Sequence, residues 1–298
     1  MLHAFTGRWY YYAMSYFLLG LNFALMFLIP VAVATVIRRK TGAPWRLFFI
    51  GGVTFILSQV AHIPFNWIVQ QSGILPTDLS SWTNLLIVAT FLGLSAGVFE
   101  ETARYLTYRF WAKDARSWSR GLMLGAGHGG TESILVGVLA TVSFVGLVLT
   151  ATNETLLSTI PAEQRALVTD SLAEVLATPW YGLLLGAVER ILAIITHLAL
   201  SLLVLQVFLR RSLIWLFIAI GYHALFNAIA VISADRLGPY AAEGILAIFS
   251  LFSLFIIIRL RGPEPDTTPE TTLPAPDPVA TVELQPTDEA LDRSRYSD

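Results

Sequence analysis

Several ionisable and amide side chains of this 298-residue chain lie within long apolar stretches, where such groups are costly and usually mark function. Neutral imidazoles, together with a carboxylate or carboxamide, can bind a divalent metal ion such as zinc and leave one position open for water. A nearby carboxylate can take a proton from that water and pass it to a leaving amine. These residue types therefore allow hydrolysis of an amide bond. The candidates are Glu100, Glu101 and Arg104 for catalysis, and His128, Glu132, His197, His223 and Asn227 for metal binding.

The spacing of these residues places them in pairs on single helical faces. Residues four positions apart share one face of a helix. Glu100 and Glu101 are adjacent and lie about 100° apart on a helix, so they cannot both face the same point. One glutamate is expected to act as the base. The other is expected to pair with Arg104 or with a residue that supports the site without contacting the reacting atoms. The pairs four positions apart are Glu100 with Arg104, His128 with Glu132, and His223 with Asn227.

The depths of the candidates along their helices agree with one another. At about 1.5 Å per residue, His128 lies about 10 Å inside the cytoplasmic end of its span, Glu100 and His223 about 15 Å, and His197 about 18 Å. Hydropathy does not require this agreement between four separate segments. The agreement in depth predicts that these four residues meet in one site in the cytoplasmic half of the membrane.

The elements that must position these residues are membrane-spanning helices. About 20 mostly apolar residues are needed to cross a bilayer. Seven stretches meet that requirement, so the predicted fold is an all-α polytopic bundle. The first stretch is too long for a signal peptide and no small-residue cleavage site precedes its basic end, so it is expected to be retained. The predicted spans are 12–37, 47–69, 85–110, 121–150, 180–209, 213–231 and 241–258.

The composition excludes several other classes of protein. Hydrophobic residues make up 55% of the chain and charged residues 13%, against about 25% charged residues in soluble domains. The formal net charge of -2 gives no basic surface for nucleic acid, and neither a nucleic acid nor a nucleotide is expected as a partner. The chain has no cysteine, which excludes disulfides, thiolate nucleophiles and iron–sulfur clusters.

The distribution of basic residues predicts the orientation. Twelve lysines and arginines follow spans one, three, five and seven, whereas Arg8, Arg165 and Arg236 lie on the opposite side. The excess marks the cytoplasmic side, so the N-terminus is expected outside and the C-terminus in the cytoplasm. The loop 151–179 is expected to form a short amphipathic helix at the outer surface.

Two regions of different character make up the chain. Residues 1–261 are expected to form the transmembrane bundle, with a peptidase-like core at about 84–232. Residues 262–298 hold 7 of the 14 prolines and 9 of the 21 acidic residues and lack an apolar period. This tail is therefore predicted to be disordered.

The ordered motifs resemble those of a known superfamily. The segments FEETAR at 99–104, GHGGTES at 127–133 and HALFN at 223–227, with an ER…H span between the last two, resemble the YhfC-type branch of the CAAX-protease and bacteriocin-processing intramembrane metalloproteases. The anti-sigma site-1 protease PrsW is a more distant relative. The resemblance implies a helical bundle that cleaves peptide bonds in or near the bilayer, with Glu100 or Glu101 activating water. It also implies that His128, His223 and Asn227 form the ligand or polarising cluster.

The sequence departs from the main superfamily pattern in two positions. Arg104 follows the second glutamate by three residues instead of four, and Leu124 stands where phenylalanine is usual, four residues before His128.

Some polar residues have structural alternatives. Asn227 is either a ligand or an interhelical hydrogen-bonding group, Glu132 either a ligand or the group that orients His128, and His197 either a ligand or a gating residue. Glu189 and Arg190 are interpreted as a structural or cavity-lining pair. His62 and Asn66 imitate the last motif, but Pro64 between them indicates a kink, so a structural role is favoured there.

Three functions are compatible with these residues. The first is an intramembrane metal-dependent endopeptidase acting on a membrane-associated protein or peptide in a bacterial cytoplasmic membrane. The second is a proton-coupled transporter or channel, which would require a polar path to both faces. The third is a non-catalytic membrane scaffold whose site is vestigial.

Overall fold

The computed structural model describes residues 2–262, and this part of the chain is helical with no strand. Seven helices are long and apolar enough to cross a membrane, as predicted. The predicted tail lies outside the described residues. The helices are α1 (Leu2–Thr41), α2 (Trp45–Gln71), α3 (Trp82–Leu106) continued by the π-helical turn η1 (Thr107–Trp111), α4 (Trp118–Thr152), α5 (Glu154–Thr159), α6 (Ala162–Ala177), α7 (Trp180–Leu183), α8 (Leu185–Leu209), α9 (Ile214–Leu237) and α10 (Pro239–Arg259).

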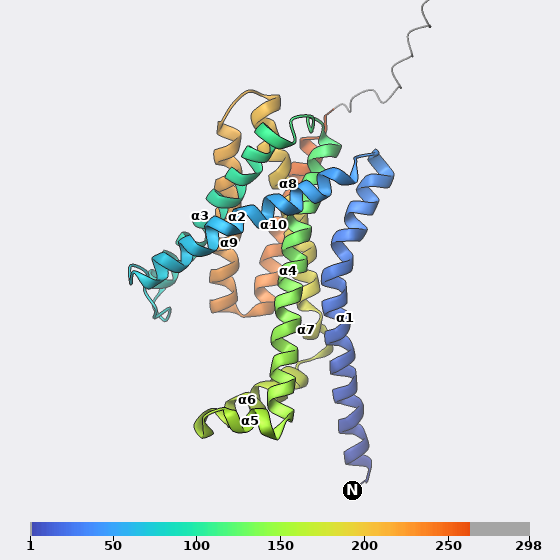
Figure 1. The fold of residues 1–298 in the computed structure, drawn as a ribbon, viewed down its shortest axis with the longest axis vertical. Coiled ribbons are helices and arrows are strands. Elements are labelled where there is room, and N and C mark those ends of the chain that lie inside the picture. The colour runs from blue at the N-terminus through green and yellow to red at the C-terminus, as the bar shows by residue number, and fades with distance from the viewer. Residues whose placement is uncertain (1, 263–298) are drawn as a thin grey trace, which may run out of the picture. The chain divides into compact units, whose positions relative to one another are not determined.

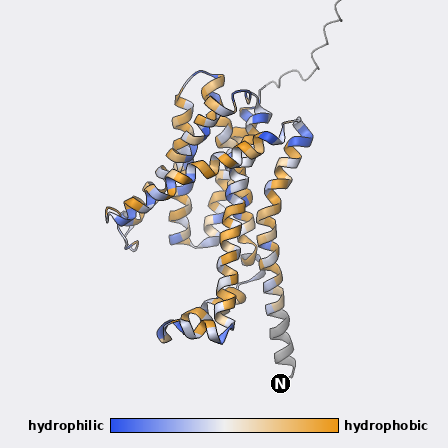
Figure 2. Cartoon of the chain, viewed as in Figure 1, coloured by the Kyte–Doolittle hydropathy of each residue, from blue (hydrophilic) through white to orange (hydrophobic). Residues whose placement is uncertain are grey.

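The long helices carry apolar residues around most of their circumference (Figure 2). Large apolar side chains such as Leu139, Val142, Phe217 and Leu251 are largely exposed on the outside of the bundle. In water such a surface would drive aggregation, but lipid is as apolar as these side chains. Polar side chains are instead buried between the helices, which is the distribution expected of a bilayer-embedded bundle.

Helix α4 is the central element and packs against α1, α2 and α8 (Figure 1). Its glycine run makes these approaches close. A Cβ at Gly127 would overlap the backbone carbonyl of Phe48 on α2, and one at Gly129 would lie 2.8 Å from the Cβ of His197 on α8. Small residues allow membrane helices to approach in this way. The run therefore brings His128 into the space between α2 and α8.

Helices α3 and α9 form the most extensive pair in the bundle. Gly97 of α3 faces the backbone of α9, where an added Cβ would lie 2.7 Å from the carbonyl oxygen of Ile220. One turn further along α3 come Glu100 and Glu101, opposite His223 of α9. The close backbone contact thus holds the two glutamates against the histidine.

The predicted fifth span differs from the structure in one respect. The sequence predicts one helix over 180–209, but the structure divides it into α7 and α8 at Leu184. The amide N–H of Ala187 donates to Oδ1 of Asn22 on α1 at 2.8 Å, so a distant helix caps the start of α8. Hydropathy carries no signal for such a cap, because the partner comes from another element.

The loop between α4 and α8 contains more helix than the single amphipathic segment predicted. Its first helix, α5, starts at Asn153, whose side chain accepts hydrogen bonds from the amides of Thr155 and Leu156. An asparagine at this position stabilises a helix start. The longer α6 follows, and both α5 and α6 pack against the end of α4 (Figure 1).

Candidate metal centre and its polar surroundings

One carboxylate and three imidazoles from four different helices meet inside the bundle. We call them the Glu100 cluster, and each member is at most 6% exposed. Oε2 of Glu100 lies 3.0 Å from Nε2 of His128 and 3.9 Å from Nε2 of His223. The rings of His128 and His197 are centred 5.1 Å apart, and those of His197 and His223 5.3 Å apart. The helices thus bring together groups that lie up to 123 positions apart in the sequence.

The neighbouring carboxylate, Glu101, contacts the cluster only through His223, and its charge is compensated by an arginine. Its Oε2 forms an ion pair with Nη1 of Arg104, and both side chains are completely buried. Its Oε1 lies 2.8 Å from Nδ1 of His223. A carboxylate paired with arginine only accepts, so Nδ1 of His223 donates and Nε2 keeps a free lone pair facing Glu100. Such a carboxylate–histidine contact typically orients a metal-binding imidazole.

His197 is held between an arginine and a second carboxylate. Nη2 of Arg104 donates to Nδ1 of His197 at 3.2 Å, since arginine can only donate. The other ring nitrogen, Nε2, lies 2.5 Å from Oε2 of Glu132. Both ring nitrogens of His197 therefore have partners within the protein, and His197 can bind a metal ion only by giving up one of these two contacts. Glu132 contacts His197 on α8 rather than His128 on its own helix.

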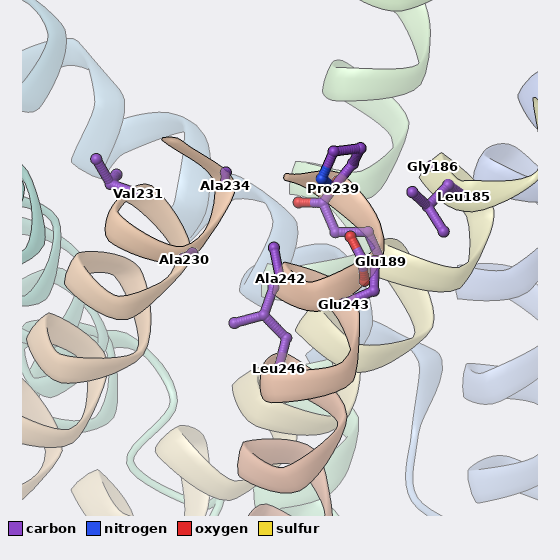
Figure 3. Close-up of a pocket in the computed structure, with 10 residues that line it drawn as sticks. All are labelled: Leu185, Gly186, Glu189, Ala230, Val231, Ala234, Pro239, Ala242, Glu243 and Leu246. Atoms are coloured by element: carbon purple, nitrogen blue, oxygen red, sulfur yellow. The ribbon is translucent and has the colours of Figure 1, made fainter. Parts of the chain in front are cut away.

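From Glu132 a charged network continues towards the α8–α10 side. Oε1 of Glu132 accepts from Nη1 of Arg190 at 2.9 Å, and Nη2 of Arg190 pairs with Glu189. We call Glu132, Arg190 and Glu189 the charged arm. Glu189 lines a cavity of about 400 Å³ together with Glu243 of α10, and the two carboxylates lie on facing helices there (Figure 3).

A second network leaves Glu100 on the α2 side and contains no charge. Nε2 of Gln59 donates to Oε1 of Glu100 at 3.2 Å, and Oε1 of Gln59 lies 3.2 Å from Nδ1 of His62. Nε2 of His62 lies 3.1 Å from Oγ of Ser95 and 3.0 Å from Nδ2 of Asn66. We call Gln59, His62, Ser95 and Asn66 the neutral arm.

Glu100 differs electrostatically from two neighbouring carboxylates, the buried Glu101 and the partly buried Glu132. Glu101 and Glu132 each contact an arginine, whereas the partners of Glu100 among the described residues are imidazoles and the Gln59 amide. A buried carboxylate without a cationic partner is expensive and is expected only where function requires it. This difference separates the two adjacent glutamates, which their spacing alone could not do.

The donors of the Glu100 cluster fit a divalent metal ion. Ligand atoms of Glu100, His197 and His223 all lie within 4.8 Å of one another, and all three residues are buried. Two imidazoles and one carboxylate form a set that catalytic zinc uses with an open position for water. Nδ1 of His128 is also buried without a hydrogen-bond partner.

Seven of the eight predicted site residues belong to one connected network: Glu100, Glu101, Arg104, His128, Glu132, His197 and His223. Asn227 is half-buried one turn beyond His223, and within residues 2–262 no hydrogen bond joins it to the cluster. Its role as a ligand stays a prediction.

The sequence interpretation missed Gln59 and gave His62 only a structural role. That interpretation relied on the kink expected at Pro64, but α2 continues through Pro64, and Gln59 joins His62 to Glu100 of another helix. The spacing of Gln59, His62 and Asn66, at three and four residues, places all three on one face of α2 and was the available signal.

Comparison with known proteins gives two matches. A family model described as YhfC intramembrane metalloprotease matches residues 25–249. The chain is also 34% identical over 249 residues to a Bacillus subtilis (strain 168) protein described as uncharacterized membrane protein YhfC, covering 82% of this chain and 95% of that protein. No solved structure matches the chain.

Proposed function

Because the chain belongs to the YhfC intramembrane metalloprotease family, we propose that it is a peptidase that hydrolyses a peptide bond of a membrane-associated protein or peptide. It is a multi-pass membrane protein, and we place it in the bacterial cytoplasmic membrane with its C-terminus in the cytoplasm. The observation that carries the proposal is Glu100, a buried carboxylate that contacts imidazoles and, among the described residues, forms no ion pair with an arginine.

In this proposal Glu100 acts as the base. Its Oε2 faces the imidazoles and its Oε1 faces Gln59, so one oxygen can serve as a ligand while the other accepts a proton. Water loses that proton as its oxygen attacks the peptide carbonyl carbon. The carboxyl group then returns the proton to the amide nitrogen as the C–N bond breaks, giving an acid and an amine.

The remaining residues of the network hold these groups in place. Glu101 fixes the ring of His223, while Arg104 neutralises Glu101 and fixes His197. His128 positions the Glu100 carboxylate through Nε2. Rigid support of this kind keeps the reacting groups within the small tolerance that catalysis requires.

Glu100 and His223 would hold the metal ion that the family name implies, and His197 would join them by releasing its contact with Arg104 or with Glu132. A divalent ion, for which we propose zinc, would supply a more acidic water and stabilise negative charge on the carbonyl oxygen.

The proposal is tested with the conservative variant Glu100→Gln. Membranes from a host lacking the gene are incubated with the purified wild-type protein or the variant, and new peptide N-termini are identified by mass spectrometry. We expect a defined set of termini with the wild type, lost with Glu100→Gln and retained with Glu154→Gln on the surface helix α5. An unchanged set with Glu100→Gln would remove Glu100 from the reaction.

The transporter alternative is less well supported by the polar networks. By the chain direction of their helices, both arms run towards the side where α2 ends and α3, α8 and α10 begin. Among the described residues, no hydrogen bond continues either arm through to the opposite face. Loss of ion flux in liposomes with Glu100→Gln, without loss of proteolysis, would favour transport instead.

A further inference from the structure

A second cavity, separate from that in Figure 3, lies where α2 ends and α3 begins. Its volume is about 340 Å³. The lining includes the amides of Asn66 and Gln70, the hydroxyl of Thr77, and the apolar side chains of Phe91 and Leu92. Gln70 and Thr77 are exposed, so the cavity has a polar rim at the surface of the protein.

The neutral arm connects this cavity to Glu100. Asn66 lines the cavity and contacts His62, and His62 contacts Gln59, which donates to Oε1 of Glu100. Ser95 lies beside His62, one turn from the cavity residue Leu92, to whose carbonyl its hydroxyl donates at 3.1 Å. Each of these contacts from Glu100 to Asn66 and Ser95 has a donor–acceptor distance between 3.0 and 3.2 Å.

One end of this path has an unsatisfied hydrogen-bonding atom. Oδ1 of Asn66 is buried and has no partner within the protein. Such an acceptor is costly unless a water molecule donates to it, and polar pockets of this kind usually hold water. The remaining groups of the neutral arm are amides, an imidazole and a hydroxyl, which can both donate to and accept from water.

We propose that the neutral arm is the route by which water from the α2–α3 cavity reaches Glu100. The inference rests on the proposed function, because each peptide bond hydrolysed consumes one water molecule at a site that is almost completely buried. Water arriving past Gln59 meets Oε1 of Glu100, the oxygen that does not contact His128. The charged arm is less suitable as a route because each of its three side chains is held in an ion pair that water would have to replace.

The absence of cysteine allows a direct test of aqueous access. Ser95→Cys places a thiol on the neutral arm of the full-length protein in detergent micelles, and Ser201→Cys places a matched buried thiol on α8, where Ser201 contacts Tyr108 and Gly121. Reaction with a small water-soluble methanethiosulfonate is followed by mass spectrometry. We expect Ser95→Cys to react roughly tenfold faster or more than Ser201→Cys, because the reacting thiolate requires water.

A second substitution tests whether the water passes Asn66. Asn66→Leu in the Ser95→Cys background should slow the reaction to the rate of Ser201→Cys, and Asn66→Gln should restore part of it. The Ser201→Cys/Asn66→Leu protein controls for unfolding, because unfolding would make its thiol reactive. Two results would overturn the route. One is equal labelling rates for Ser95→Cys and Ser201→Cys, and the other is a Ser95→Cys labelling rate that Asn66→Leu leaves unchanged.

The outcome can be separated from that of the proposed function. Thiol labelling requires no peptidase activity, so the route can stand even if Glu100→Gln leaves proteolysis unchanged. If both proposals hold, Asn66→Leu should lower kcat for peptide cleavage while leaving KM unchanged, since it restricts water and not the peptide.

Discussion

The two arms that leave the Glu100 cluster differ in how they satisfy buried polar groups. The charged arm pairs Glu132 and Glu189 with Arg190, so its ionised groups compensate one another. The neutral arm contains only groups that both donate and accept, and it ends at an unpaired amide oxygen. Ion pairs in a low-dielectric interior fix a geometry, whereas neutral hydrogen bonds exchange with water at lower cost. The comparison assigns a supporting role to the charged arm and an access role to the neutral arm.

The largest effect on stability is expected from breaking the charged arm. Arg190→Met leaves the partly buried Glu132 without its arginine. Removing one partner of a buried ion pair costs about 3–5 kcal/mol, and because the Glu132 side chain is 23% exposed we expect a loss at the lower end of that range. Unfolding in detergent should therefore start at a clearly lower denaturant concentration or temperature. The double variant Glu132→Gln/Arg190→Met removes both charges and should recover part of the loss. If the double variant lost as much free energy of unfolding as the two single variants lose together, Glu132 and Arg190 would not compensate each other.

A metal ion should stabilise the point where the arms meet. If Glu100, His197 and His223 hold zinc, zinc at about 100 times its dissociation constant adds about 2.7 kcal/mol to the free energy of unfolding. Thermal unfolding of the chelator-treated protein, with and without zinc, measures this shift. His223→Ala should abolish it, whereas His62→Ala should retain it. A similar shift in all three proteins would place the zinc elsewhere.

A smaller loss is expected in the neutral arm. Gln59→Leu removes the amide between Glu100 and His62 and leaves polar atoms of both without that partner, which costs about 1–3 kcal/mol. The matched control is Gln70→Leu at the exposed rim of the cavity, which should leave stability nearly unchanged. Chemical denaturation compares the two variants with Arg190→Met. If Gln59→Leu lowered the free energy of unfolding as much as Arg190→Met does, the two arms would not differ in their contribution to stability.

The smallest effect is expected from an exposed ion pair, which serves as a reference for the buried ones. Nη2 of Arg46 donates to Oδ2 of Asp114 at 2.5 Å, and this hydrogen bond holds the pKa of Asp114 below its ordinary value. Both side chains are about half exposed, so Asp114→Asn should cost no more than about 1 kcal/mol.

The sign of the pH dependence follows from the direction of that shift. Because the folded-state pKa is lowered, the stabilisation is present above the ordinary pKa of about 4 and is lost as the pH falls through the folded value. The difference in unfolding temperature between the wild type and Asp114→Asn should therefore shrink in acid. A difference that grows on acidification would contradict the pairing.

The sequence by itself determined the helical membrane architecture and much of the candidate site. Apolar runs long enough to cross a bilayer are a local property, so the seven spans among the described residues could be predicted to within six residues at each end. The agreement in depth of Glu100, His128, His197 and His223 followed from helix rise alone. The family was likewise predictable, because its motifs are short segments of consecutive residues.

Only the tertiary structure decided how these polar groups are partnered. The rotation of α3 about its own axis decides that Glu100 faces His128, while Glu101 faces Nδ1 of His223 and pairs with Arg104 of its own helix, and spacing cannot give that rotation. Gln59 and His62 became part of the site because α2 packs against α3 and α4. The division of the fifth span at Leu184 depends on Asn22 of a distant helix. Contacts between helices depend on packing across the whole bundle, whereas hydropathy and periodicity report on one segment at a time.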